Sequence, residues 1–124
     1  KRFKIDTRDA LKALRAAGGI PILAHPGEKL YNLHFEKLLR DLKIHGLLGL
    51  EVYHPSHRKE LSNKLYAIAR KNRLIISGGS DFHGQLDAKS PFINDKLGRY
   101  GLNEHLTQKL IGFHKKMQEN ITHN

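Results

Sequence analysis

The sequence predicts an α/β fold in which parallel strands alternate with helices. Three short apolar segments, residues 20–23, 47–53 and 74–76, have the composition of buried strands. A stretch with apolar residues at helical spacing precedes each of them, and alternation of this kind is typical of parallel sheets covered by helices. Each apolar segment also ends in histidine or acidic residues, which indicates chemistry at one edge of the sheet.

The first helix and strand occupy about residues 7–23. Asp6 or Thr7 can cap the helix, and Gly18 with Gly19 can end it. The apolar residues that recur at helical spacing are Ala10, Leu11, Leu14 and Ala17. Pro21 fits only near the start of the following strand, so we expect His25 to stand where that strand ends.

The second and third units repeat this order. A helix containing Phe35, Leu38, Leu39 and Leu42 is expected to stop at Gly46, before the strand that leads into the segment 51–57. A third helix, with a predicted cap at Ser56, should end near Asn72, and Leu74–Ile76 form the next strand. Asn103 is expected to cap a last helix running towards Met117.

Polar residues therefore follow three strands that should be parallel. His25 ends the first, the segment 51–57 ends the second, and Asp81 with His83 follows the third. Because the carboxyl ends of parallel strands share one edge of the sheet, we expect these residues to lie close together. Barrels of alternating strands and helices, and open α/β sheets, both place their active sites at that edge.

Metal binding is the chemistry that this residue set favours. The chain has no cysteine, so any metal must be held by His, Asp and Glu. His25, Asp81 and His83 are the predicted ligands. Taken singly, each has an ordinary structural alternative: His25 could bond to backbone at a strand end, and Asp81 could cap a turn beside an exposed His83.

Further candidates lie at the second and third tips. His54 and His57 flank a Pro-Ser pair and could bind a metal or a substrate phosphate, and Ser80 is a candidate for substrate binding, although nothing nearby marks it as a nucleophile. Glu51 lies within its strand, which leaves open a structural role beneath the site or a role as an inward-facing ligand. The histidines expected to be ordinary surface residues are His34, His45, His105, His114 and His123.

Composition narrows the class of protein. The chain has 124 residues, enough for one domain or a piece of one, and a formal net charge of +10, which favours anionic partners. No apolar run approaches the length of a membrane span, and the N-terminus lacks a signal sequence, so we expect a cytoplasmic protein with no membrane partner. An alternative function is a nucleic-acid-binding module that uses Arg58, Lys59, Lys64, Arg70, Lys71 and Arg73.

Three motifs resemble the PHP (polymerase and histidinol phosphatase) family of metal-dependent phosphoesterases. They are Ala24-His25-Pro26, Glu51-Val52-Tyr53 and Gly79-Ser80-Asp81-Phe82-His83. The resemblance implies a distorted (β/α)7 TIM-like barrel with two or three divalent ions, manganese, zinc or iron, and carries His25, Asp81 and His83 over as ligands. It also implies hydrolysis of a phosphate ester by metal-activated water, with a nucleoside 3′,5′-bisphosphate or a short oligonucleotide as the expected substrate.

The chain departs from the family pattern at its beginning. The family opens with an Asp-x-His-x-His strand and further ligands, and nothing before His25 matches them. Residues 1–124 therefore resemble the C-terminal half of a PHP domain, incomplete for catalysis by itself. Because a sheet cut from a barrel has unpaired edges, we expect a homo-oligomer or association with the missing half of the barrel. A regulatory module that has lost catalysis is the remaining alternative.

Overall fold

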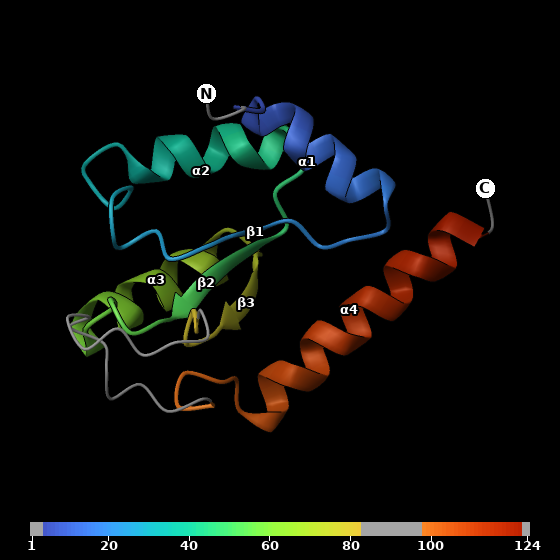
Figure 1. Ribbon diagram of the computed structural model, residues 1–124. Helices are drawn as coiled ribbons and strands as arrows, with labels where there is room; N and C mark the ends of the chain where they lie inside the picture. Colours follow the sequence, from blue (N-terminus) through green and yellow to red (C-terminus); the bar gives the residue numbers. More distant parts are fainter. Residues whose placement is uncertain (1–3, 83–97, 123–124) are drawn as a thin grey trace.

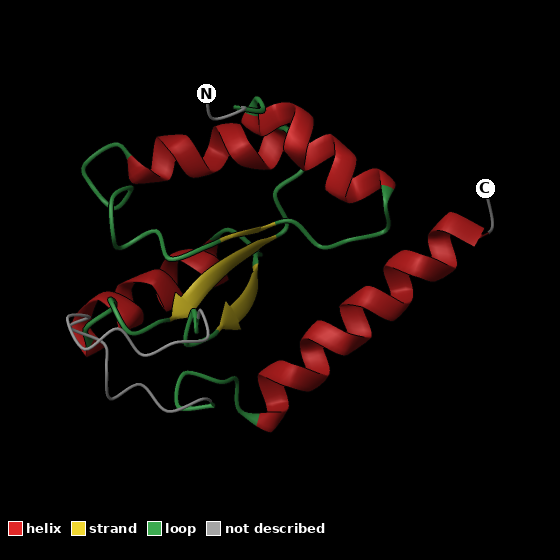
Figure 2. Ribbon diagram, viewed as in Figure 1, coloured by secondary structure: helices red, strands yellow, loops and turns green. Residues whose placement is uncertain are grey.

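The computed structural model describes residues 4–82 and 98–122, and it places a small sheet among helices (Figures 1 and 2). The elements in chain order are α1 (Thr7–Ala16), β1 (Ile22–Leu23), α2 (Phe35–Ile44), β2 (Gly49–Tyr53), α3 (Lys59–Lys71), β3 (Ile75–Gly78) and α4 (Glu104–Thr122).

The sheet has three strands in the order β1-β2-β3, and both strand pairs are parallel. Leu23 pairs with Leu50 in one register, and Glu51 pairs with Ser77 in the other, with an irregularity between Glu51 and Tyr53. The predicted α/β fold with alternating helices and parallel strands is confirmed. That this sheet is half of a seven-stranded barrel stays a prediction.

The core lies on the face of β2 that carries Leu50 and Val52, both 0% exposed. Alternation along the strand puts Glu51 and Tyr53, each partly buried, on the other face. The core side chains from the helices include Leu11 of α1, Phe35, Leu39 and Leu42 of α2, and Leu65 and Ala69 of α3. Burial of these apolar side chains is what orders the strands, and thereby the tips that follow them.

Three helices end with the same hydrogen-bond pattern. The residue after each C-cap has a positive φ, namely Gly18 at 75°, Gly46 at 106° and Arg73 at 54°. In α3, the N–H of Arg73 donates to the carbonyl of Arg70, and the N–H of Leu74 donates to the carbonyl of Ala69. This is the Schellman arrangement, and only at Arg73 does a residue with a Cβ occupy the left-handed position.

Two of the predicted helix caps are confirmed, and one is wrong. The side chain of Asp6 accepts from the N–H of Arg8, and that of Asn103 accepts from the N–H of Leu106. Helix α3 begins instead at Lys59, with Arg58 at its N-cap. Ser56 does not cap it, because both its N–H and its hydroxyl contact the Nδ1 atom of His54.

Helix α4 runs diagonally past β3, with its far end near the turn that follows α1 (Figure 1). Leu106 anchors its first turns in the core, and the Nε2 atom of Gln118 donates to the carbonyl of Gly18 at 2.9 Å. None of the helices in the described part of the chain is long and apolar enough to cross a membrane.

Candidate metal centre at the strand tips

His25 follows β1 at a turn whose backbone is held by β2. The backbone of His25 has φ 24°, a conformation that residues with a Cβ seldom adopt. Its N–H donates to Oε2 of Glu51 at 2.6 Å. Of the two roles that the sequence left open for Glu51, this hydrogen bond favours the structural one: the carboxylate fixes the turn that presents His25.

The ring of His25 lies beside Glu28, three residues further along the same turn. The Nδ1 atom of His25 is 3.4 Å from Oε2 of Glu28, and both side chains are about a third exposed, at 36% and 35%. An acidic oxygen on this side favours a proton on Nδ1. The lone pair of His25 is then on Nε2, as in metal sites where a carboxylate orients the histidine ligand.

His57 joins the same turn to the end of β2. It is 5% exposed, and its Nε2 atom accepts from the N–H of Gly27 at 3.0 Å. Since Nε2 is an acceptor, the proton of the neutral ring is on Nδ1, which donates to the carbonyl of Val52 at 2.9 Å. Gly27 has no room for a side chain, because a Cβ there would lie 2.5 Å from Cδ2 of His57. Binding of substrate by His57 would require one of these two hydrogen bonds to break.

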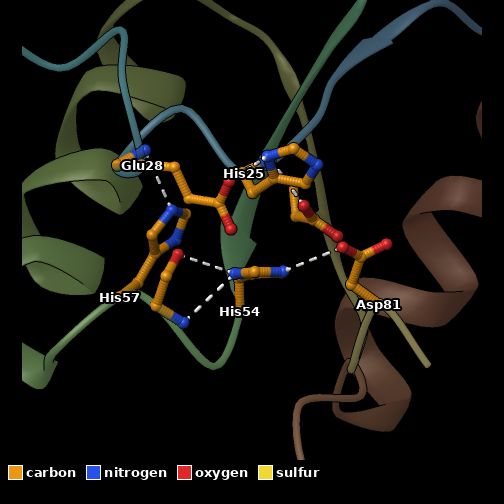
Figure 3. Close-up of polar contacts among 8 residues, drawn as sticks. His25, Glu28, His54, His57 and Asp81 are labelled. Atoms are coloured by element: carbon orange, nitrogen blue, oxygen red, sulfur yellow. Dashed lines mark hydrogen bonds and ion pairs between the residues drawn. The ribbon is translucent and has the colours of Figure 1, made fainter. Parts of the chain in front are cut away.

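His54 is the buried centre of the site, lying between His57 and Asp81 (Figure 3). It is 2% exposed, and its ring centroid is 5.1 Å from that of His25 and 5.4 Å from that of His57. Burial lowers the pKa of His54 below its ordinary value, and the charge of Glu51 opposes this only in part. The ring is therefore neutral near pH 7.

The proton of that neutral ring can be placed from its contacts. The N–H of Ser56 donates to Nδ1 of His54 at 3.1 Å, and the Ser56 hydroxyl is 2.8 Å from the same atom. Nδ1 is thus an acceptor, and the proton is on Nε2. That Nε2 atom is buried and has no hydrogen-bond partner within the described residues.

Asp81 follows β3 and approaches His54 from the far side of the site. Its Oδ2 atom is 3.9 Å from Nε2 of His54, and its side chain is 44% exposed. Its backbone has φ 52°, so two of the predicted ligands, His25 and Asp81, adopt the left-handed conformation. Strained backbone of this kind is concentrated at functional sites, where the surrounding structure must hold it.

These residues fit a divalent cation by the chemistry of their donors. The turn after β1 offers Nε2 of His25, and the turn after β3 offers the carboxylate of Asp81, the mixture that zinc, manganese and iron accept. Residues 4–82 and 98–122 contain no group of three or more His, Asp or Glu side chains arranged to hold a metal. The third predicted ligand, His83, lies outside the described residues.

The remaining candidate residues and the other histidines differ in how exposed they are. Ser80 is partly buried and lies in the segment that connects β3 to Asp81. Its contact with substrate stays a prediction. Glu28 was not among the sequence candidates, although an acid three residues after a turn histidine is a usable signal. His34, His105 and His114 are exposed as expected; His45 is only partly exposed and its Nε2 is buried without a partner in the described part of the chain, whereas His123 lies outside it.

Two proteins are similar in sequence to most of this chain, and the similar region is only a part of each of them. The chain is 40% identical over 81 residues to a phosphoribosyl 1,2-cyclic phosphate 1,2-diphosphodiesterase of Eggerthella lenta, covering 65% of the chain and 29% of that protein. It is 36% identical over 76 residues to a 3′,5′-nucleoside bisphosphate phosphatase of Chromobacterium violaceum, covering 60% and 27%. No protein-family model matches the chain.

A solved structure extends this likeness to the fold. A protein of Bifidobacterium adolescentis described as a metal-dependent phosphoesterase superposes with a TM-score of 0.71 and 27% sequence identity. The match covers 90% of the chain and 37% of that protein. The chain spans less than a third of the two sequence relatives. The chain is thus similar in sequence to a part of two phosphoester hydrolases and similar in fold to a part of a metal-dependent phosphoesterase.

Proposed function

We propose that this chain supplies part of the metal centre of an enzyme that hydrolyses phosphate esters. The observation that carries the proposal is the convergence of His25, His54 and Asp81 at one end of a three-stranded parallel sheet. The three residues follow three different strands. The likeness of the chain in sequence to two phosphoester hydrolases supports the same reaction class.

Each residue of the site would have a separate role in binding the metal ion. Nε2 of His25 and the carboxylate of Asp81 would hold a divalent ion, manganese, zinc or iron, together with His83. Such an ion, when bound, activates water and neutralises charge on the phosphoryl group. Glu51 holds the backbone of His25 through its 2.6 Å hydrogen bond. His57 holds Gly27, two residues further along the same turn. The protein thereby fixes the position of the ligand before the ion arrives.

The proposed substrate is a phosphorylated small molecule or a short nucleic acid. The names of the two sequence relatives support this class, and a nucleoside 3′,5′-bisphosphate or a short oligonucleotide is the specific expectation. A net charge of +10 would favour the approach of such anions. We further propose that the protein is cytoplasmic, as the sequence predicts.

Association is part of the proposal, because the chain matches so little of its relatives. Residues 1–124 would be the C-terminal part of a PHP domain, and the remaining metal ligands would come from the rest of the barrel or from further copies of the chain. The strands β1 and β3 lie at the edges of the three-stranded sheet, and open edges of this kind favour pairing with another strand.

The test begins with metal content and hydrolysis. Purified chain would be loaded with Mn²⁺, analysed for bound metal, and assayed with a nucleoside 3′,5′-bisphosphate. We expect bound Mn²⁺ that is lost in Asp81→Ala and retained in the control Glu104→Ala, which changes an exposed acid in α4. Retention of the metal in Asp81→Ala would contradict the proposed site. Phosphate release that depends on Mn²⁺ would show that the chain is active as it stands.

Nucleic-acid binding without chemistry is the second candidate. The basic residues that the sequence analysis assigned to this function all have exposed side chains on or beside α3. One of them, Lys71, forms an ion pair with Glu36 at 3.0 Å. Their exposure favours electrostatic binding to phosphates. The affinity of the chain for single-stranded DNA would then fall steeply with salt and would be insensitive to Asp81→Ala.

A further inference from the structure

We infer that His54 is a positioning residue that donates its Nε2–H to the Oδ2 atom of Asp81. The inference deepens the proposed function and rests on it where Asp81 is taken to be a metal ligand. It assigns His54 to the carboxylate rather than to the substrate phosphate, and it gives Ser56 the task of fixing the tautomer.

The contacts of the His54 ring fix its protonation state. A backbone N–H can only donate, so the contact from Ser56 N–H makes Nδ1 of His54 an acceptor. A neutral imidazole carries one proton, which must then be on Nε2. With Nε2 protonated, His54 has no lone pair on that side for a metal ion. It can act there only as a hydrogen-bond donor.

The Nε2–H of His54 needs a hydrogen-bond acceptor. Nε2 of His54 is fully shielded from solvent and has no hydrogen-bond partner in the described part of the chain. A buried donor without a partner lowers the stability of the folded state, so the protein gains if an acceptor comes into range. The acidic oxygen that faces Nε2 is Oδ2 of Asp81, 3.9 Å away, on a side chain that is 44% exposed. The charges of Glu51 and Glu28 also act on His54, but the carboxylates of both residues contact His25. A small shift of the Asp81 carboxylate brings it into hydrogen-bond range.

The consequence concerns the carboxylate as a ligand. Asp81 follows β3 in a left-handed backbone conformation, and its carboxylate has two oxygens. A hydrogen bond from the fixed Nε2–H of His54 to Oδ2 would orient the carboxylate that the proposed function assigns to the cation. Partners of this kind around metal ligands typically change metal affinity by about 10–100-fold when removed.

The hydrogen bond can be tested without metal. In ¹⁵N-labelled chain with EDTA, we expect the neutral His54 ring to carry its proton on Nε2. We also expect the Nε2–H resonance to shift in Asp81→Ala but not in the control Glu104→Ala. A proton on Nδ1, or an Nε2–H resonance that is unchanged in Asp81→Ala, would overturn the inference.

A pair of variants tests the effect on metal binding. The amide of Gln can reach the position of Nε2, whereas the amide of Asn reaches only that of Nδ1. We therefore expect His54→Asn to weaken Mn²⁺ binding by about 10–100-fold and His54→Gln to stay close to the wild type. Equal affinity of the two variants would refute positioning by Nε2–H. If the wild-type chain binds no Mn²⁺, the proposed function fails for this chain, and the NMR result alone decides the inference.

Discussion

Replacing His57 by Phe should destabilise the fold through two specific hydrogen bonds. Phe keeps the size and planarity of the ring, so little packing is lost. It removes the acceptor for the N–H of Gly27 and the donor to the carbonyl of Val52, at 3.0 and 2.9 Å. The second of these bonds is buried and the first partly buried.

The magnitude follows from what is left without a partner. A buried polar group that loses its partner costs about 1–3 kcal/mol, and a partly buried one costs less because water can replace the partner. Together the two groups should lower the free energy of unfolding by about 2–4 kcal/mol. For a chain of 124 residues this is a large part of the total, which is typically about 5–15 kcal/mol.

Urea unfolding followed by circular dichroism, at pH 7.5 with EDTA, measures this loss. His34→Phe is the matched control, because His34 is exposed and its side chain makes no capping hydrogen bond to α2. The control should stay within about 0.5 kcal/mol of the wild type. A loss of less than about 1 kcal/mol in His57→Phe would refute the reasoning that both nitrogens of His57 are engaged in the folded chain.

Three further predictions concern single groups. Arg73→Gly should raise the free energy of unfolding by about 0.5–1 kcal/mol. Gly relieves the strain of φ 54° at the end of α3, and this gain exceeds the cost of the greater freedom of Gly in the unfolded chain. Urea unfolding checks this, with Arg73→Ala, which keeps the Cβ, as the comparison. Burial lowers the pKa of His54 below 6.5, so the unfolded chain takes up its proton first, and stability should fall as pH drops below about 6.5 towards the folded-state value. With EDTA present, that loss should be smaller in His54→Gln, and an identical pH dependence would contradict the assignment. Glu51→Ala should cost about 1–3 kcal/mol by leaving the N–H of His25 without its acceptor, whereas Glu51→Gln, which keeps an oxygen, should cost less; similar losses in the two variants would argue against that bond.

The site is organised by the segment that follows the middle strand. Glu51 holds the turn after β1, His57 holds the same turn two residues later, and His54 faces the turn after β3. A central strand has neighbours on both sides, so its tip can contact both flanking tips. The residues at the middle tip therefore serve the proposed ligands on either side, and substitutions there should alter metal binding without removing a ligand.

The sequence by itself determined the elements and their order. Apolar periodicity predicted the helices and strands, and local capping signals at Asp6, Gly18, Gly46 and Asn103 marked where helices begin or end. These signals act within a few residues along the chain, so they can be read without the fold. The alternation of strands with helices also predicted that the three polar tips share one edge of the sheet.

Only the tertiary structure decided what each histidine does. His57 meets the N–H of Gly27 from 30 residues away, and Glu51 meets the N–H of His25 from 26 residues away. Which ring nitrogen carries a proton depends on the donors and acceptors that face it, and those come from distant parts of the chain. Sequence spacing alone therefore grouped His54 and His57 as candidates for substrate, whereas their contacts assign one to the turn after β1 and direct the other towards Asp81.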